Sequence, residues 1–238
     1  MQPVLQFNPY RKSVWRLIEL QSQPSTQKIT DTLEEQALLE DILERSKPEV
    51  PEECLSLDYQ MRSPFRYGRY PQSSRFRRVG RTLGVYYASE EPITAALEAA
   101  WYRVRFFNAA IDLPELDKTL ALTAIAVLVS TPFSVDLRKA SMSEAGNWTD
   151  PDDYSDCLNL ADDVREAKGE LIVYQSVRHP QNEANVAVLT CNAFEQPKPV
   201  EQQTWHVHIK SDRVILRCET TRQSYEFVVG EKAFIDAA

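Results

Sequence analysis

The sequence predicts a single α+β domain, on three observations. The chain has 238 residues, of which 43% are hydrophobic and 26% are charged, and a chain of this kind can bury a substantial core. Helical and strand-like hydrophobic patterns are intermixed along it, and several short strand patterns follow one another in the C-terminal third. We find no internal repeat and no low-complexity tract. We therefore expect one domain that includes residues 1–238.

The N-terminal part predicts a strand followed by a helix. Residues 14–18 are apolar except for one arginine and are typical of a short strand. Residues 31–46 have helical periodicity; Asp31 or Thr32 can cap this helix, and Pro48 ends it. We expect the helix to be an arm or insert that covers the main body.

An arginine-rich segment, residues 61–81, comes next. It contains seven arginines but no Asp, Glu or Lys, and aromatic residues lie between the arginines. Two prolines and two glycines predict that the segment is a loop and not a helix. The arginines are Arg62, Arg66, Arg69, Arg75, Arg77, Arg78 and Arg81.

Three interpretations of the arginine-rich segment are open. The use of arginine and never lysine favours a phosphate clamp, because the planar guanidinium group binds phosphate oxygens in pairs. The segment can also be a solvated basic surface that pairs with the acidic residues 144–170. With its aromatic residues it can also bind nucleic acid, although an acidic chain does not favour that interpretation.

Helical and strand patterns alternate through the rest of the chain. Residues 92–107 predict a helix, because apolar residues recur there at helical spacing. Residues 120–129 are apolar on both faces and predict a central buried strand. Residues 156–168 predict a further helix. Other strands are expected at residues 83–88, 133–137, 171–176, 185–190, 205–209, 214–217 and 225–229.

Glu98 is a candidate functional residue because it lies beside the apolar stripe of the predicted helix 92–107. Its helical neighbours are Thr94, Ala95, Trp101 and Tyr102, and none of them is a cation. The ion pair usual on a helix surface is therefore unavailable to it. A carboxylate among apolar neighbours needs a distant partner or a ligand.

Three other patterns are less specific. Tyr86 and Tyr87 are adjacent in a predicted strand, so they point to opposite faces and one of them can face a pocket. Ser176 ends a strand outside any Gly-x-Ser-x-Gly motif, which argues against a serine hydrolase. The acidic residues 150–156 do not have the EF-hand register, since Tyr154 stands at a ligand position. We expect no metal, and there is no phosphate-binding glycine loop.

Bulk properties limit the compartment and the partners. The net charge is −8, which disfavours extended contacts with nucleic acid or anionic membranes. No apolar run is long enough to span a membrane, and no signal peptide is evident. The cysteines form no C-x-x-C pair, so we expect four free thiols in a reducing cytoplasm. They are Cys54, Cys157, Cys191 and Cys218.

The order of several short motifs resembles the RES-domain family, which is named for an Arg, a Glu and a Ser. The resemblance covers residues 14–229, with residues 19–60 as a helical insert. The motifs are Val-Trp-Arg-Leu at 14–17, Ser-Arg-Phe-Arg at 74–77, Gly-Val-Tyr-Tyr-Ala at 84–88, Thr-Ala-Ala-Leu-Glu at 94–98 and Tyr-Gln-Ser-Val-Arg at 174–178, with Asn185 after them.

This resemblance implies a fold and an activity. It implies a mixed-sheet domain similar to ADP-ribosyltransferases. It also implies a cytoplasmic toxin of a toxin–antitoxin pair that degrades NAD⁺ by hydrolysis or phosphorolysis. The partner would be an Xre/ParS-like helix-turn-helix antitoxin, with a homodimer or a hetero-oligomer as the assembly. By position, Arg75, Glu98 and Ser176 match the catalytic residues, and Tyr86 matches the pocket tyrosine.

The chemistry of NAD⁺ agrees with these assignments. Its pyrophosphate suits the arginines, and we expect Arg66, Arg77 and Arg178 to bind it together with Arg75. A tyrosine face attracts the cationic nicotinamide ring. Cleavage of the N-glycosidic bond leaves an oxocarbenium-like ribose that Glu98 can stabilise. Two alternatives are open: a protein ADP-ribosyltransferase that uses the same pocket, and a non-catalytic nucleic-acid-binding module.

Overall fold

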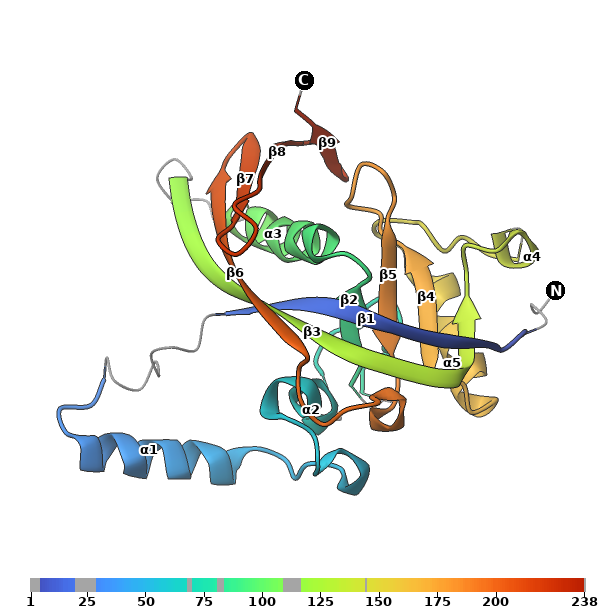
Figure 1. Ribbon diagram of the computed structural model, residues 1–238. Helices are drawn as coiled ribbons and strands as arrows, with labels where there is room; N and C mark the ends of the chain where they lie inside the picture. The colour runs from blue at the N-terminus through green and yellow to red at the C-terminus, as the bar shows by residue number, and fades with distance from the viewer. Residues whose placement is uncertain are drawn as a thin grey trace.

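One long strand organises the protein. In the computed structural model, which describes residues 5–19, 29–67, 70–80, 84–108, 117–143 and 145–237, strand β3 runs from Asp117 to Asp136 and contacts β1, β4 and β6 (Figure 1). Within these described ranges, nine strands form one mixed sheet in the order β1-β2-β5-β4-β3-β6-β7-β8-β9. The other strands are β1 (Asn8–Glu19), β2 (Tyr86–Ser89), β4 (Leu171–Gln175), β5 (Ala184–Val188), β6 (Glu201–Lys210), β7 (Arg213–Cys218), β8 (Ser224–Val229) and β9 (Phe234–Asp236).

Strand β1 closes part of the sheet into a ring. It pairs antiparallel with β3 along most of its length and also touches β2, so β1, β2, β5, β4 and β3 surround a common interior. The contact between β1 and β2 is a single pair, Trp15 opposite Ser89. Beyond this pair the two strands separate and leave an opening between β1 and β2.

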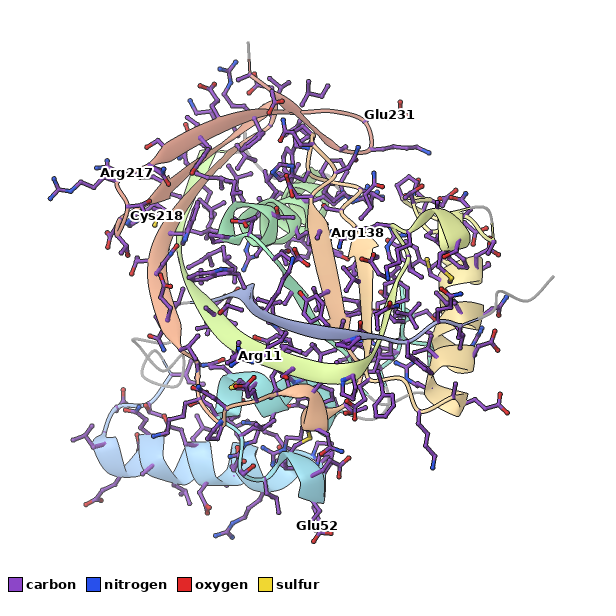
Figure 2. All side chains as sticks on the ribbon, turned by 45° about the vertical axis from the view of Figure 1, so that its right-hand side comes forward. Arg11, Glu52, Arg138, Arg217, Cys218 and Glu231 are labelled. Atoms are coloured by element: carbon purple, nitrogen blue, oxygen red, sulfur yellow. A yellow bond between two sulfur atoms is a disulfide. The ribbon has the colours of Figure 1, made fainter. Side chains whose placement is uncertain are left out.

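Three helices cover this framework. α3 (Pro92–Asn108) packs against β1, β3 and β6, where its apolar stripe includes Leu97 and Trp101. α2 (Tyr59–Arg66) lies against the ring, with Met61 and Phe65 buried. α5 (Ser155–Glu166) lies beside β4 in the views of Figures 1 and 2, and Leu160 packs there. The remaining short helices are α4 (Ala140–Ser143), η2 (Glu52–Cys54) and η3 (Cys191–Ala193).

The predicted N-terminal helix is present but does not cover the body. α1 (Leu33–Ser46) begins after Thr32, whose hydroxyl accepts the Glu35 N–H at 3.1 Å, as predicted. None of its residues is buried, and Leu38 is 61% exposed. Figure 1 shows α1 at the side of the molecule. The expectation of a covering helix is wrong: of the described residues 29–67, those from η2 to α2 pack on the sheet.

The arginine-rich segment is not a loop throughout, which corrects the prediction. Its first residues belong to α2, which Asp58 caps by accepting the Gln60 N–H at 2.9 Å. Pro64 is inside the helix and buried, because the apolar face of α2 packs on the ring. A Cβ on Gly84 would be 1.5 Å from the Pro64 carbonyl oxygen, so only glycine permits this approach. The predictions for residues 68–69 and 81–83 lie outside the described residues.

The two strands predicted at 120–129 and 133–137 are parts of one strand, β3. Pro132 lies within it, where the pairing with β1 changes register between Asn8 and Tyr10. A proline is tolerated at such an irregularity because it cannot donate to the ladder. The other predicted strands are confirmed within a few residues, and β9 was not predicted. Among the described helices, none has the length and apolarity needed to cross a bilayer.

The prediction of four free thiols is wrong for two cysteines. Cys54 and Cys191 form a disulfide between η2 and η3, with a Cα–Cα distance of 5.4 Å. The two positions are 137 residues apart, and the fold of the intervening chain brings them together. Cys157 and Cys218 are free and buried.

Candidate functional site

A cavity lies where β1 and β2 separate. Its volume is about 280 Å³. α3 forms one wall, the end of the β4–β5 hairpin forms another, and Tyr154, in the turn before α5, also lines the cavity. Its lining residues are Trp15, Arg16, Leu17, Ser74, Arg75, Tyr87, Ala88, Ser89, Ala95, Glu98, Ala99, Tyr102, Arg103, Tyr154, Tyr174, Val177, Arg178 and Asn185.

Glu98 presents a carboxylate to this cavity. Its Oε1 accepts a hydrogen bond from Ser176 Oγ at 2.7 Å and another from Asn185 Nδ2 at 2.6 Å. Ser89 Oγ in turn donates to Asn185 Oδ1 at 2.6 Å, which fixes the orientation of the amide. Within the described part of the chain, Oε2 of Glu98 receives no hydrogen bond. One oxygen therefore positions the group and the other is available to a ligand.

Distant segments supply the partners of Glu98. Asn185 lies on β5, directly opposite Ser89 on β2 and Tyr174 on β4. Ser176 is the first residue after β4. Glu98 is in the second turn of α3, which packs over these strands. The sheet register thus builds the cluster, and the partners are 78 and 87 residues away in sequence.

Ser176 positions other groups and does not itself line the cavity. It is fully buried. Its oxygen accepts the N–H groups of Arg178 at 3.2 Å and His179 at 3.1 Å while its hydroxyl donates to Glu98. The hydroxyl therefore joins the turn after β4 to the carboxylate. We classify Ser176 as a positioning residue.

Arg75 and Arg178 line the cavity and hold the loop of residues 148–154. Arg75 Nη1 donates to the Trp148 carbonyl at 2.8 Å, and its Nη2 donates to the Asp150 carbonyl at 2.9 Å. Arg178 Nη2 donates to the Pro151 carbonyl at 2.8 Å. Both side chains are buried, and neither makes an ion pair with a carboxylate of a described residue. Backbone carbonyls and the rings of Tyr154 and Trp101, and not carboxylates, contact these guanidinium groups. Their positive charge beside the cavity favours an anionic ligand.

The other arginines of the segment lie elsewhere, which corrects the expectation for Arg66 and Arg77. Arg66 forms an ion pair with Glu44 of the arm at 2.6 Å. The guanidinium carbon of Arg77 is 3.6 Å from the centre of the Tyr70 ring, and its Nη2 donates to the Gln72 carbonyl. Arg78 contacts Asp162 on α5 at 2.8 Å, so Arg66 and Arg78 join the segment to other elements, whereas the contacts of Arg77 lie within the segment. None of the three lines the cavity.

Tyr87 lines the cavity, whereas Tyr86, the tyrosine expected there, does not. Tyr86 is fully buried on the interior side of the ring, where it packs on Phe194 with ring centres 5.2 Å apart. Tyr87 points to the opposite face and lines the cavity. Its hydroxyl oxygen accepts the Phe76 N–H at 3.0 Å and lies 2.8 Å from Ser74 Oγ. The expected strand alternation is confirmed, and the role of either tyrosine in ligand binding stays a prediction.

Several cavity residues were not predicted. Tyr174 is buried beside the cavity, and burial, reinforced by the Glu98 carboxylate, raises the pKa of its phenol well above the ordinary value. It therefore stays neutral. Arg16 lines the opening from β1, and its Nη1 is buried with no hydrogen-bond partner among the described residues. An arginine inside an otherwise apolar strand was the signal that could have identified it.

The comparison with protein families decides the classification. The family model for the RES domain matches residues 49–210, which is more than half of the chain. The chain belongs to the RES-domain family. Arg75, Glu98 and Ser176 lie within the matched residues, whereas Arg16 lies outside them.

Two further comparisons add little to this RES domain. One similar solved structure is a chain of the MbcT–MbcA toxin–antitoxin complex of M. tuberculosis. The identity is 9% and the TM-score 0.47, over 86% of this chain and 87% of that chain. A search of curated protein sequences gave no match.

Proposed function

We propose that this RES domain is the toxin of a toxin–antitoxin pair and that it consumes NAD⁺ by breaking the nicotinamide–ribose bond. The observation that carries the proposal is the Glu98 carboxylate, held at the cavity by Ser176 and Asn185 through one oxygen, with the other oxygen free of described partners. Membership of the RES family supports it. Cavity residues of both required kinds, arginines and tyrosines, surround this carboxylate.

The cavity suits the two charged parts of NAD⁺. Tyr87 and Tyr174 offer aromatic faces beside Glu98, and such faces attract the cationic nicotinamide ring. Arg75 and Arg178 carry positive charge that no described carboxylate neutralises, so they favour the pyrophosphate. Arg16 adds a buried guanidinium nitrogen with no hydrogen-bond partner among the described residues, and its guanidinium carbon lies 4.9 Å from the centre of the Tyr86 ring. In this arrangement the arginines both hold the loop and attract the substrate.

The proposed reaction breaks the bond between ribose C1′ and the nicotinamide nitrogen. The bond electrons leave with nicotinamide, which becomes neutral, and positive charge develops on the ribose. The Glu98 carboxylate stabilises that charge, and the stabilisation is larger in the transition state than in the bound substrate. Water then adds to C1′ and releases a proton, or phosphate adds in its place. Ser176 and Asn185 keep the carboxylate in position throughout.

The remaining expectations from the family resemblance are part of the same proposal. They are a fold similar to ADP-ribosyltransferases, a cytoplasmic location and an Xre/ParS-like helix-turn-helix antitoxin that covers the cavity. A nucleic-acid-binding function is not favoured, because Arg66, Arg77 and Arg78 already have partners within the protein. We also propose that residues 1–238 are one domain.

Product analysis tests the proposal. The purified protein is incubated with NAD⁺, with and without phosphate, and the products are identified by mass. We expect nicotinamide together with ADP-ribose, or with ADP-ribose 1″-phosphate when phosphate is the acceptor. Nicotinamide release with the ADP-ribose attached to a protein would replace this proposal with a protein ADP-ribosyltransferase. Unchanged NAD⁺ under all conditions would contradict both.

A further inference from the structure

The surface of α3 beyond Glu98 carries two large aromatic side chains. Tyr102 follows Glu98 by one helical turn and Phe106 follows by two, so the three residues lie on one face of α3. Tyr102 lines the cavity and yet is 67% exposed, and Phe106 is 72% exposed. Large aromatic side chains rarely remain this exposed side by side in a protein without a ligand to cover them.

Two arginines flank Tyr102 at the same rim. Arg103 lines the cavity and is 3.4 Å from Glu19, and Arg105 is 3.5 Å from Asp152 in the loop. Both carboxylates are largely exposed, so these ion pairs contribute little to stability. Either arginine can exchange its carboxylate for a phosphate oxygen at small cost. The rim therefore combines aromatic faces with available cations, which is the chemistry that binds a nucleotide.

We propose that this rim is the binding site for the adenine end of the dinucleotide, with the purine stacked on Tyr102 and Phe106. The phosphate on the adenosine side then lies near Arg103 and Arg105, and the phosphate on the nicotinamide side lies near Arg75 and Arg178. The inference rests on the proposed function and extends it from one end of NAD⁺ to the other. With a rise of 1.5 Å per residue, Tyr102 is about 6 Å and Phe106 about 12 Å along α3 from Glu98. A dinucleotide whose nicotinamide end lies at Glu98 can thus follow α3 out of the cavity.

The consequence is selection of dinucleotides over mononucleotides. The inner cavity, with Glu98, Tyr87 and Tyr174, recognises the nicotinamide riboside half. Nicotinamide mononucleotide would occupy only that part and gain nothing from Tyr102. Adenosine diphosphate, which has no nicotinamide riboside, would occupy the rim and the phosphate positions but not the nicotinamide end. This ligand therefore reports on the rim without any cleavage reaction.

Calorimetric binding of adenosine diphosphate to the full chain tests the proposal. Removal of a stacking ring weakens nucleotide binding by about 5- to 150-fold. We expect Tyr102→Ala to raise the Kd at least fivefold, and Tyr102→Phe to stay within about twofold of the native value because it keeps the ring. Tyr59→Ala is the matched control, since Tyr59 is an exposed tyrosine on α2 that does not line the cavity. It should leave the Kd unchanged.

The outcomes separate this inference from the proposed function. No binding of adenosine diphosphate, or equal binding by Tyr102→Ala and the native chain, overturns the inference even if NAD⁺ is cleaved. Tyr102-dependent binding without any NAD⁺ cleavage supports the inference and overturns the proposed function. In kinetics, Tyr102→Ala should lower kcat/KM at least fivefold more for NAD⁺ than for nicotinamide mononucleotide. Equal losses for the two substrates would place Tyr102 at the nicotinamide end instead.

Discussion

Replacement of Ser176 by alanine separates positioning of Glu98 from stability of the fold. The hydroxyl of Ser176 donates to Glu98 Oε1 at 2.7 Å and accepts the N–H groups of Arg178 and His179. Alanine removes all three bonds and changes the side-chain volume very little. We therefore expect two effects of different origin, one on unfolding and one on turnover.

The magnitude of each effect follows from the geometry. The two N–H groups lose their acceptor in a buried site, and a lost buried hydrogen bond costs about 1–3 kcal/mol. The two bonds are long, at 3.2 and 3.1 Å, so we expect a total loss of about 1–3 kcal/mol in unfolding free energy. Glu98 keeps its bond to Asn185 at 2.6 Å but loses its second support. Displacement of a catalytic group by a fraction of an ångström to 1 Å lowers turnover by about 10- to 100-fold.

Thermal unfolding and initial rates of nicotinamide release, measured well below the melting temperature, check both effects. Ser134→Ala is the control, because Ser134 is a buried serine on β3 whose hydroxyl donates to the Asn8 carbonyl at 2.7 Å, outside the cavity. This control should lose stability and keep its turnover. The reasoning is refuted if Ser176→Ala retains native turnover per folded molecule, or loses no more than Ser134→Ala.

Three other predictions follow from the structure. Arg75→Lys should lower the unfolding free energy by about 1–3 kcal/mol and weaken NAD⁺ binding, since one ammonium group cannot make both carbonyl hydrogen bonds of the planar guanidinium group. Chemical unfolding measures the first effect and calorimetry the second, and native values for both would contradict the prediction. Reduction of Cys54–Cys191 by a dithiol should lower the unfolding free energy by about 2–5 kcal/mol, because the bond closes a long loop; an unchanged Tm after verified reduction is the contrary result. Leu38→Ser on α1 should change stability by less than about 0.5 kcal/mol in thermal unfolding, since Leu38 is exposed; a larger loss would mean that the arm packs on the body.

Local patterns were enough to predict most of the secondary structure. The apolar stripe of α3 and the short apolar runs of the C-terminal strands are signals within one element, so their positions were correct. The exposure of α1 was not predictable in this way, because an amphipathic pattern does not show whether another element packs against the apolar face of the helix. The disulfide between Cys54 and Cys191 also depends on the tertiary fold, since it joins positions 137 residues apart.

The candidate site was predictable only in part. The lack of a helical partner for Glu98 indicated a distant one, and the structure supplies Ser176 and Asn185. Strand alternation showed that only one of Tyr86 and Tyr87 could face a pocket, but the choice depends on which face of β2 is interior.

The distribution of the arginines likewise depends on their surroundings. Arg66 lies near the arm residue Glu44, Arg78 lies near Asp162 of α5, and Arg77 stacks on Tyr70. Only the tertiary structure shows that Arg75 alone, among the described arginines of the segment, reaches the cavity.

The rate of nicotinamide release from NAD⁺ by the native chain and by Glu98→Gln tests the central claim most directly. Glutamine can keep its carbonyl oxygen between Ser176 and Asn185 and place its amide where Oε2 was, so the fold and the melting temperature should be preserved. Only the negative charge is lost. The account predicts release by the native chain and a rate lower by about 10²-fold or more in the variant. A folded Glu98→Gln protein that releases nicotinamide at the native rate would contradict it.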